Sequence, residues 1–384
     1  MPAETVSPER LTELAAAMVA IPSVNPFGGS EGGAEADLAA FVAGRLADIG
    51  AVVDVREVAS GRQNVYARLA GDGQGKTLMF AGHLDTVGVE GYADPFSPRL
   101  SGGKLFGRGA CDMKGGLAAI IEAATVLAAA GAPRGGEVIV AALCDEEFAM
   151  LGSRAVGREG PHADMAIVAE PTGLIVCPAH KGQLGVVIRT LGRSAHSSMP
   201  ELGENAIDSM ARVLERLRSY DAVLRAAPPH PLCGRARFNV GVIAGGTVAS
   251  IVPASCQVEV DRRTLPGETY HGVTAEIEAH LASLREEGVR FEVEGPTWDI
   301  PPLDVSVDST VVRLAGAAHE AATGSVARID AFPAATDAPN LGCPAVVYGP
   351  GDLAVAHSAD EWVEVEELAT AARTYVEAAL HLGD

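Results

Sequence analysis

Residues 77–87 read TLMFAGHLDTV, and this stretch decides the fold class. Its first part, TLMFAG, is a continuous apolar run of the kind that a parallel strand buried on both faces requires. Similar runs, EVIVAAL at 137–143 and MAIVA at 165–169, alternate with helical segments. This alternation predicts an α/β domain with a mixed, largely parallel sheet and helices on both faces.

Helical patterns flank these strands. Ser7 followed by Pro8 predicts the start of a helix, because serine caps a first turn and proline fits its first position. The apolar spacing continues from Leu11 to Met18 and ends before Pro22. Further helices are expected at 34–49, 118–130 and 365–382, and a last strand is expected at 345–349.

The pattern changes near Lys181, where the expected strands alternate more regularly between apolar and polar residues. Strands are expected at 183–190, 257–262 and 289–293, and amphipathic helices at 205–224 and 269–284. This order predicts a small ferredoxin-like α+β domain inserted into the α/β domain. We therefore expect one domain at 1–181 and 298–384, and a second, inserted domain at 182–297.

Length and charge limit the possible partners. The 384 residues exceed what one compact core usually serves, which agrees with two domains. Fifty Asp and Glu against 29 Lys and Arg give a formal charge of −21. Because that charge repels phosphate backbones and anionic lipid surfaces, we expect neither a nucleic acid nor a membrane as partner.

The N-terminal segment and the cysteines indicate the compartment. The first residues are acidic where a signal peptide needs basic ones, and no uncharged apolar run is long enough to span a membrane. The six cysteines stand at long spacings without a C-x-x-C pair, which favours reduced thiols over a disulfide framework or a cysteine zinc site. A cytoplasmic location is expected.

His83 and Asp85 follow the apolar run of 77–82 and lie two residues apart, so their side chains point the same way along a strand. A histidine in this position suits a metal ion, because a nearby carboxylate can accept its second ring N–H. A simple His–Asp ion pair at the strand end is the alternative.

Acidic residues follow the other expected strands. Asp112 lies among glycines in GRGACDMKGG, Glu146 and Glu147 lie in LCDEEFAMLGS, and Glu170 lies in IVAEPTG. Simpler interpretations stay open at this point. Asp112 could cap a helix that begins near Lys114, and the CDEE acids could form a solvated turn.

His357 supplies a second histidine, in VAHSADEW. Four of these five segments lie at the C-terminal ends of α/β strands or directly after them, which is the edge where open α/β sheets bind ligands. Two histidines and three or four carboxylates at that edge match a two-metal site. Zinc accepts imidazole nitrogen and carboxylate oxygen, and one carboxylate can bridge two ions.

Six sequence blocks carry a family resemblance: HLDTV, GRGACDMKGG, CDEEFAMLGS, AEPTG, HKGQLGVVIRTLGRSAHSSMPELGENAID and TDAPNL…GPGDLAVAHSADEWV. In this order they resemble the di-zinc amidohydrolase and exopeptidase family of acetylornithine deacetylase, succinyl-diaminopimelate desuccinylase and carboxypeptidase G. The resemblance covers nearly the whole chain. It implies a catalytic domain at 1–181 and 298–384, and a homodimer formed through 182–297 as a dimerisation or lid domain.

The resemblance implies a set of metal ligands. His83 and Glu170 would bind one divalent ion, Glu147 and His357 would bind the other, and Asp112 would bridge the two. Zinc is the implied metal, with cobalt as a possible substitute. A cis peptide bond would follow the bridging aspartate.

The resemblance also implies catalytic roles around the ions. Asp85 would orient His83. Glu146 would be the general base, which takes a proton from the metal-activated water and returns it to the leaving amine. His196 would reach across the homodimer and hold the tetrahedral oxyanion in the partner's active site.

Substrate contacts are implied at four further positions. Arg263 would hold the substrate carboxylate, and the backbone turn at Gly349 and Gly351 would line the same pocket. Ser250 stands where related enzymes often carry Asn. Serine reaches less far and offers one donor instead of two, so this contact to the oxyanion or the substrate carboxylate is expected to differ.

These features together indicate a hydrolase that cleaves the amide bond of an N-acyl amino acid, in the manner of acetylornithine deacetylase or the desuccinylase. The HKG, TDAP and GPG stretches most resemble acetylornithine deacetylase. One alternative is a dipeptidase or carboxypeptidase of the same family that acts on a short peptide. The other is a non-catalytic binding protein that retains the fold, against which the intact ligand set argues.

Overall fold

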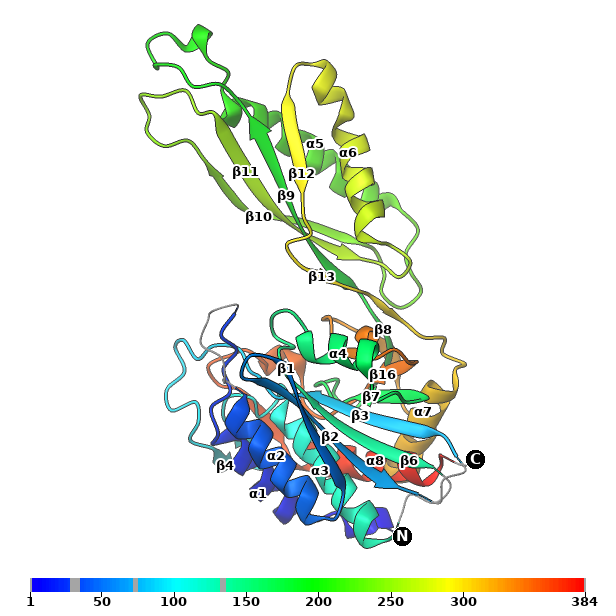
Figure 1. Ribbon diagram of the computed structural model, residues 1–384. Coiled ribbons are helices and arrows are strands. Elements are labelled where there is room, and N and C mark those ends of the chain that lie inside the picture. The colour runs from blue at the N-terminus through cyan, green and yellow to red at the C-terminus, as the bar shows by residue number, and fades with distance from the viewer. Residues whose placement is uncertain (1, 28–34, 72–74, 132–135, 383–384) are drawn as a thin grey trace. The chain divides into compact units, whose positions relative to one another are not determined.

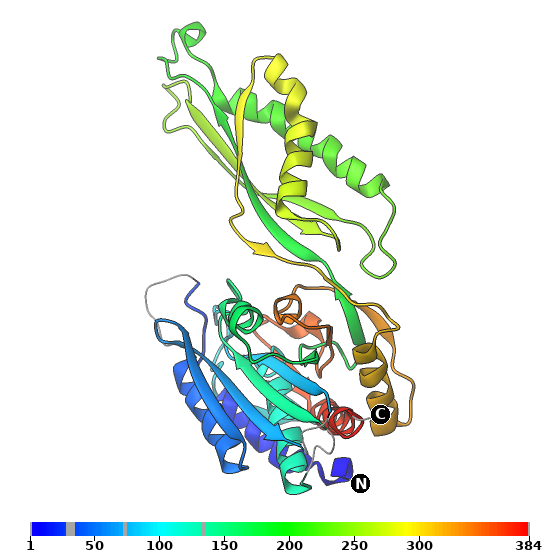
Figure 2. The ribbon, with the colours of Figure 1, turned by 45° about the vertical axis from the view of Figure 1, so that its right-hand side comes forward.

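The computed structural model describes residues 2–27, 35–71, 75–131 and 136–382. The chain forms two compact units, whose elements are labelled in Figure 1 and seen from a second side in Figure 2. The first unit comprises Met1–Ala179, Val305–Phe332 and Thr336–Asp384, and the second comprises His180–Asp304 and Pro333–Ala335. The assignment of 182–297 to a dimerisation or lid domain stays a prediction.

A mixed sheet forms the centre of the first unit. Its strands are β1 (Val52–Ala59), β2 (Arg62–Ala70), β3 (Thr77–His83), β6 (Glu137–Leu143), β7 (Met165–Val168), β8 (Val176–His180), β15 (Ile329–Phe332) and β16 (Ala345–Val347). The order is β1-β2-β6-β3-β7-β16-β8, and β15 pairs with β8. The central strands β6, β3, β7 and β16 are parallel, while β1 and β2 are antiparallel additions. The predicted α/β class with a mixed sheet is confirmed.

Helices surround this sheet: α1 (Pro8–Val19), α2 (Ala36–Asp48), α3 (Lys114–Ala129), α4 (Leu151–Glu159), α7 (Thr310–Thr323) and α8 (Val365–Leu380). The predicted start of α1 is confirmed, since the Ser7 side chain accepts the N–H of Arg10. The helix predicted at 34–49 is α2, although residue 34 lies outside the described residues. The helix α3 begins at Lys114, the start considered for a helix after Asp112, and four residues before the 118–130 range of the Ala-rich pattern. Its first turn holds Gly115 and Gly116, which disfavour a helix but allow close packing, since a Cβ on Gly116 would lie 2.2 Å from the Ala169 carbonyl oxygen.

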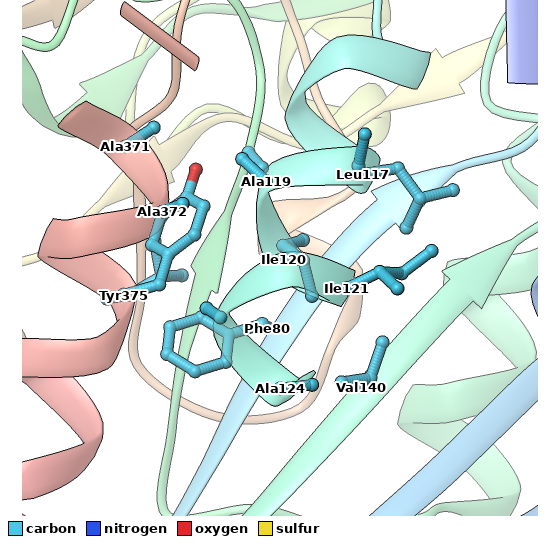
Figure 3. Packing of buried hydrophobic residues seen from close by; sticks show 14 of the residues in the cluster. Phe80, Leu117, Ala119, Ile120, Ile121, Ala124, Val140, Ala371, Ala372 and Tyr375 are labelled. Carbon is cyan, nitrogen blue, oxygen red and sulfur yellow. The ribbon is translucent and has the colours of Figure 1, made fainter. Parts of the chain in front are cut away.

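The core of the first unit lies between the sheet and the helices α3 and α8 (Figure 3). Phe80 of β3 contacts Tyr375 of α8, with ring centroids 5.1 Å apart. Figure 3 also labels Ile120 and Ile121 on α3, which belong to the same core cluster. Each such side chain contributes about 1.5–3 kcal/mol by leaving water, so this core fixes the strand ends that carry the predicted site.

A small antiparallel sheet joins residues 362–364, near the C-terminus, to residues 99–106. It has the order β17-β5-β4, from β17 (Trp362–Glu364), β5 (Lys104–Phe106) and β4 (Arg99–Ser101). Trp362 pairs with Phe106 in an antiparallel register. The loop that follows His357 is therefore anchored beside the chain that leads to Asp112.

The second unit has the chain order β9 (Gly182–Leu191), α5 (Ala206–Ala226), β10 (Arg237–Gly245), β11 (Ser255–Thr264), α6 (Tyr270–Glu286) and β12 (Arg290–Glu294). The short strands β13 (Asp299–Ile300) and β14 (Leu303–Asp304) follow. The antiparallel sheet has the order β10-β11-β9-β12, which is the ferredoxin-like arrangement. Burial alternates along β11, whose Val258 and Val260 belong to the core with Ile277 of α6.

Three further predictions can be compared with the structure. The described residues contain no helix that is both long and apolar enough to cross a membrane. All six cysteines are free thiols, and Cys343 alone among them is not buried, as expected for reduced cysteines. The peptide bond between Asp112 and Met113 is cis, as the resemblance implied.

Candidate metal centre

The parallel strands bring the predicted ligands to one edge of the sheet. His83 is the last residue of β3, and Glu170 follows the end of β7, the neighbouring parallel strand. Glu147 follows β6 on the other side of β3. Asp112 precedes α3, and His357 lies in the loop between β16 and β17. Ligands that are far apart in sequence therefore meet because carboxyl ends of parallel strands share an edge.

His83 is oriented for metal binding through one ring nitrogen. Its Nδ1 donates to the backbone carbonyl oxygen of Asp85 at 2.9 Å, so that the neutral ring, once Nε2 has lost its proton, offers the Nε2 lone pair to a metal ion. Nε2 lies 2.9 Å from Asp112 Oδ1 and 3.8 Å from Glu170 Oε1. The Asp85 carboxylate is farther away, with Oδ1 3.6 Å from Nδ1, so its orienting role stays a prediction.

Asp112 lies between the two histidines. Its Oδ1 faces His83 Nε2, and its Oδ2 lies 3.1 Å from His357 Nε2. The same His357 nitrogen lies 3.4 Å from Glu147 Oε1. Asp112 does not cap the following helix: the N-cap residue is Met113, and no side chain makes a cap hydrogen bond there. The capping alternative is therefore wrong.

The protonation states reflect this crowding of charge. Hydrogen bonds to Asp112 and Glu147 raise the pKa of His357 to about 10. Burial opposes protonation of His83, yet Asp112 and Glu170 raise its pKa well above the usual value. Burial favours the neutral form of Asp112, but hydrogen bonds from His357 and His83 outweigh it and lower its pKa. Burial raises the pKa of Glu170. Without a metal ion, protons on the imidazoles hold the carboxylates together.

The donor set fits divalent metal ions. One ligand atom each from His83, Asp112 and Glu147 lies within 4.8 Å of the others. The buried Oε1 atom of Glu170 has no hydrogen-bond partner among the residues that the structure describes, and that of Glu147 has only the contact with His357 Nε2 at 3.4 Å. A buried carboxylate oxygen without a donor is costly unless a cation supplies the missing contact. Two imidazoles and three carboxylates form a donor set that zinc accepts.

Glu146 and Glu147 are held in place by their backbone. The Asp85 carboxylate accepts the N–H of Glu146 at 3.1 Å and that of Glu147 at 3.0 Å. Burial raises the pKa of Glu146 well above its usual value; the positive charge of His83 opposes this shift and the negative charge of Glu170 adds to it. Asp145, the first acid of this turn, is fully buried. The alternative of a solvated acidic turn is therefore wrong.

Sequence reasoning missed the polar network behind this turn. Asn25 donates through Nδ2 to Asp85 Oδ2 at 2.7 Å and to Asp145 Oδ1 at 3.0 Å. Arg62 pairs with Asp145 at 2.6 Å and with Glu35. Arg62 starts β2 and is followed by two more polar residues, Gln63 and Asn64, so the sequence pattern gives no signal for this buried network.

Asp337 also had no predicted role, although it belongs to the TDAP stretch. Its side chain is buried, and burial raises its pKa to about 7. Its negative charge contributes to the raised pKa values of Glu146 and Glu170. Asp337 therefore belongs to the carboxylate cluster of the centre.

The predicted glycine turn packs against the chain that follows Glu170. Gly349 exchanges hydrogen bonds with the Thr172 hydroxyl, at 3.1 and 3.2 Å. A Cβ on Gly349 would lie 2.6 Å from the Glu170 carbonyl oxygen, and Gly351 has a φ of +99°. Both positions therefore require glycine, while their contact with substrate stays a prediction.

The remaining predicted residues, His196, Ser250 and Arg263, belong to the second unit. His196 and Ser250 lie on adjacent segments, since His196 pairs with Ile251 and the N–H of Ser197 donates to the Ser250 carbonyl at 3.0 Å. Both are exposed. Arg263 lies near the C-terminal end of β11, whereas the segment with Ser250 precedes the N-terminal end of this strand. Arg263 pairs with Asp261 at 3.1 Å.

Comparisons with known proteins identify the family of this chain. Residues 79–381 match Peptidase family M20/M25/M40. Over 372 residues, the chain is 31% identical to acetylornithine deacetylase of Salmonella arizonae and to that of Salmonella typhimurium, and each match covers 92% of both chains.

Solved structures share the fold. Aminopeptidase PepT of Bacillus cereus has a TM-score of 0.80 at 24% identity and covers 99% of this chain and 100% of its own. A dinuclear metal-binding M20 peptidase of Bacillus subtilis has a TM-score of 0.72 at 17% identity, covering 97% of both chains. Human carnosine dipeptidase 1 has a TM-score of 0.71 at 16% identity, covering 98% and 97%. The family match over most of the chain and the 31% identity to curated deacetylases together make this chain a hydrolase of peptidase family M20/M25/M40.

Proposed function

We propose that this hydrolase cleaves the amide bond of an N-acyl amino acid with the help of two divalent metal ions, zinc in the first place or cobalt. One observation carries the proposal: each oxygen of the Asp112 carboxylate faces the Nε2 of a different histidine, His83 or His357. That arrangement suits a bridging ligand. Glu170 would complete the ligand set beside His83, and Glu147 would complete it beside His357.

When bound, such ions lower the pKa of a water molecule toward neutrality and polarise the scissile carbonyl. Glu146 would remove the proton from this water and deliver it to the leaving amine. The buried surroundings that raise the pKa of Glu146 suit this exchange, because a base that must also act as an acid works best near the operating pH. Asp85 would keep Glu146 in position through the backbone N–H bond.

Arg263 would bind the carboxylate of the substrate. Its guanidinium is partly exposed and pairs with Asp261 alone among the described acidic residues, so it can exchange this contact for a substrate carboxylate. The backbone turn at Gly349 and Gly351 would line the same pocket. Ser250, in place of the usual asparagine, would reach less far toward the substrate and would offer one donor instead of two. The range of accepted substrates would differ accordingly.

His196 would serve the active site of the partner in a homodimer. Its Nδ1 accepts the N–H of Ser198 at 3.2 Å, so the proton of the neutral ring lies on Nε2, which is suited to donate to an oxyanion. Ser255 pairs with Leu191, five residues before His196, and lies about 27 Å from Arg263 along β11. A small substrate cannot span that distance, so the two residues of one chain serve different sites.

The second unit offers a surface for such a dimer. The strand β10 is an edge of its sheet, and Ile243 on it is 56% exposed. A groove of about 510 Å³ next to the His196 segment is lined by apolar side chains that include Ile207, Val248 and Ile251. An exposed strand edge beside exposed apolar residues is suited to pair with a copy of itself across a two-fold axis.

The substrate class can be tested with a panel of N-acetyl, N-formyl and N-succinyl amino acids and dipeptides on zinc- and cobalt-loaded protein. We expect an N-acyl amino acid to have the highest kcat/KM. Faster turnover of dipeptides than of every N-acyl amino acid would replace the deacylase proposal with the dipeptidase alternative. Gel filtration with light scattering tests the dimer, for which a monomer would be the contrary result.

A further inference from the structure

Glu361 lies outside the predicted ligand set, yet it contacts the chain that carries Asp112. It is fully buried and follows His357 by four residues. Its Oε1 accepts the backbone N–H of Cys111 at 2.9 Å and that of Asp112 at 3.0 Å. Its Oε2 accepts from Arg108 Nη1 at 2.5 Å. One carboxylate therefore satisfies three donors on the Asp112 segment.

The backbone of Glu361 adds two further contacts to the same region. Its carbonyl oxygen accepts the N–H of Gly107 at 3.1 Å and the Tyr92 hydroxyl at 3.3 Å. The pairing of β17 with β5 begins at the next residue, Trp362. The segment with His357 and the segment with Asp112 are thus joined at Glu361, although nearly 250 residues separate them.

We propose that Glu361 is a positioning residue, which holds the Asp112 carboxylate in place relative to His357 so that Asp112 can bridge two metal ions. This inference rests on the proposed metal-dependent function. It has a parallel on the other side of the centre, where the Asp85 carboxylate accepts two successive backbone N–H groups, those of Glu146 and Glu147. Two buried carboxylates thus hold the two acidic segments of the centre in the same way.

Glutamate suits this position because all the groups that face it are donors. An amide in place of the carboxylate would put an NH₂ group where one of the two oxygens now lies. This group would face either Arg108 or the two backbone N–H groups, and the contact on that side would be lost because a donor cannot accept. Arg108 is itself nearly buried, with 3% of its side chain exposed, and its Nε donates to the Gly88 carbonyl at 3.1 Å. Arg108 therefore fixes Glu361 from behind.

The test compares two buried glutamates that make the same kinds of contact. Glu122 accepts the backbone N–H of Ser7 at 3.0 Å and pairs with Arg10, and none of its recorded contacts reaches a proposed ligand. In Glu361→Ala, we expect zinc affinity of the metal-stripped full chain to fall by about 10- to 100-fold, as removal of a ligand-orienting partner usually does. Glu122→Ala should lose stability but bind zinc as the wild type does.

Two measurements separate positioning from a general loss of structure. The absorption spectrum of the cobalt-loaded protein reports ligand geometry, and it should change in Glu361→Ala but not in Glu122→Ala. The kcat for the best panel substrate should fall more than KM rises, because the substrate contacts are retained.

A double variant covers the case in which Glu361→Ala does not fold. Arg108→Met with Glu361→Leu removes both buried charges together, which avoids an unpaired buried charge. Its zinc affinity should remain about 10- to 100-fold below that of the wild type. If either Glu361 variant keeps the zinc affinity and the cobalt spectrum of the wild type, the positioning role of Glu361 is wrong, while the proposed function still stands. A wild-type protein that binds no zinc would overturn the proposed function and this inference with it.

Discussion

The two units of this protein differ in how many of their charged side chains are buried. In the first unit, Arg62 pairs with Asp145 while their side chains are only 9% and 1% exposed. In the second unit, Arg290 pairs with Glu204 while their side chains are 56% and 48% exposed. Arg262 is an exception, since it is buried in the second unit. Burying charge is expensive and rarely adds stability, so its concentration in the first unit needs another reason.

That reason is the geometry of the metal centre. Two buried carboxylates of the first unit hold the backbone at proposed ligands, since Asp85 does so for Glu147 and Glu361 does so for Asp112. The second unit exposes apolar side chains on and after its edge strand β10, such as Ile243 and Val248, where a partner could cover them. Under the proposed function, the first unit would hold the metal ions and the second unit would provide the dimer surface and His196.

The largest expected effect is that of Glu146→Gln, which removes the proposed base but no proposed ligand. Turnover should fall by about 10²- to 10⁴-fold, the usual contribution of a general base, with two metal ions still bound. Glu147→Ala should instead lose metal from the His357 side. Metal analysis alongside kinetics checks both variants. Equal metal loss in the two would show that the roles of these neighbouring glutamates have been assigned wrongly.

His196→Ala tests whether the second unit takes part in the chemistry. We expect kcat to fall by about 10²- to 10³-fold with unchanged metal content, as after loss of an oxyanion donor. Mixing this variant with Glu146→Gln should restore roughly a quarter of wild-type activity, because one site in each mixed dimer is complete. Without any recovery after proven subunit exchange, His196 does not act in trans.

Metal binding should depend on pH in the direction set by His357. Its pKa of about 10 in the metal-free centre means that zinc must displace a proton at pH 7–9. Zinc affinity should therefore rise with pH, about tenfold per unit for each proton released. Calorimetry in buffers of different ionisation enthalpy counts the protons. The metal-free fold has the opposite dependence: its His357 pairs stabilise it fully below about pH 6.5, and this stabilisation is lost as the pH rises through about 10. Binding heats that do not depend on the buffer would contradict a protonated centre.

The sequence predicts the strand ends well because apolar runs such as 77–82 announce buried parallel strands. The sheet topology then explains why the ligands meet, because the carboxyl ends of the parallel strands lie at one edge of the sheet. The contacts of Asn25 and Arg62 with Asp145, and those of Glu361 with the Asp112 segment, were not predictable in this way. Hydrogen bonds to backbone N–H groups leave no sequence pattern, and Glu361 meets its partners only after the chain has folded over nearly 250 residues.

The smallest expected effect comes from an exposed ion pair in the second unit. Arg290→Ala should change the free energy of unfolding by less than about 1 kcal/mol, since exposed pairs are weak. Arg62→Ala should cost about 3–5 kcal/mol, because it leaves buried acids unpaired. Urea denaturation of both variants measures the difference. Similar costs would remove the contrast between the two units.

The first unit is proposed to hold a two-metal hydrolytic centre. The most direct measurement strips the protein of metal, adds zinc stepwise, and follows bound zinc together with amine release from an N-acetyl amino acid. We predict that two ions bind per chain and that activity returns only as the centre fills. Full activity in the metal-free protein, or zinc binding that His83→Ala and His357→Ala leave unchanged, would contradict it.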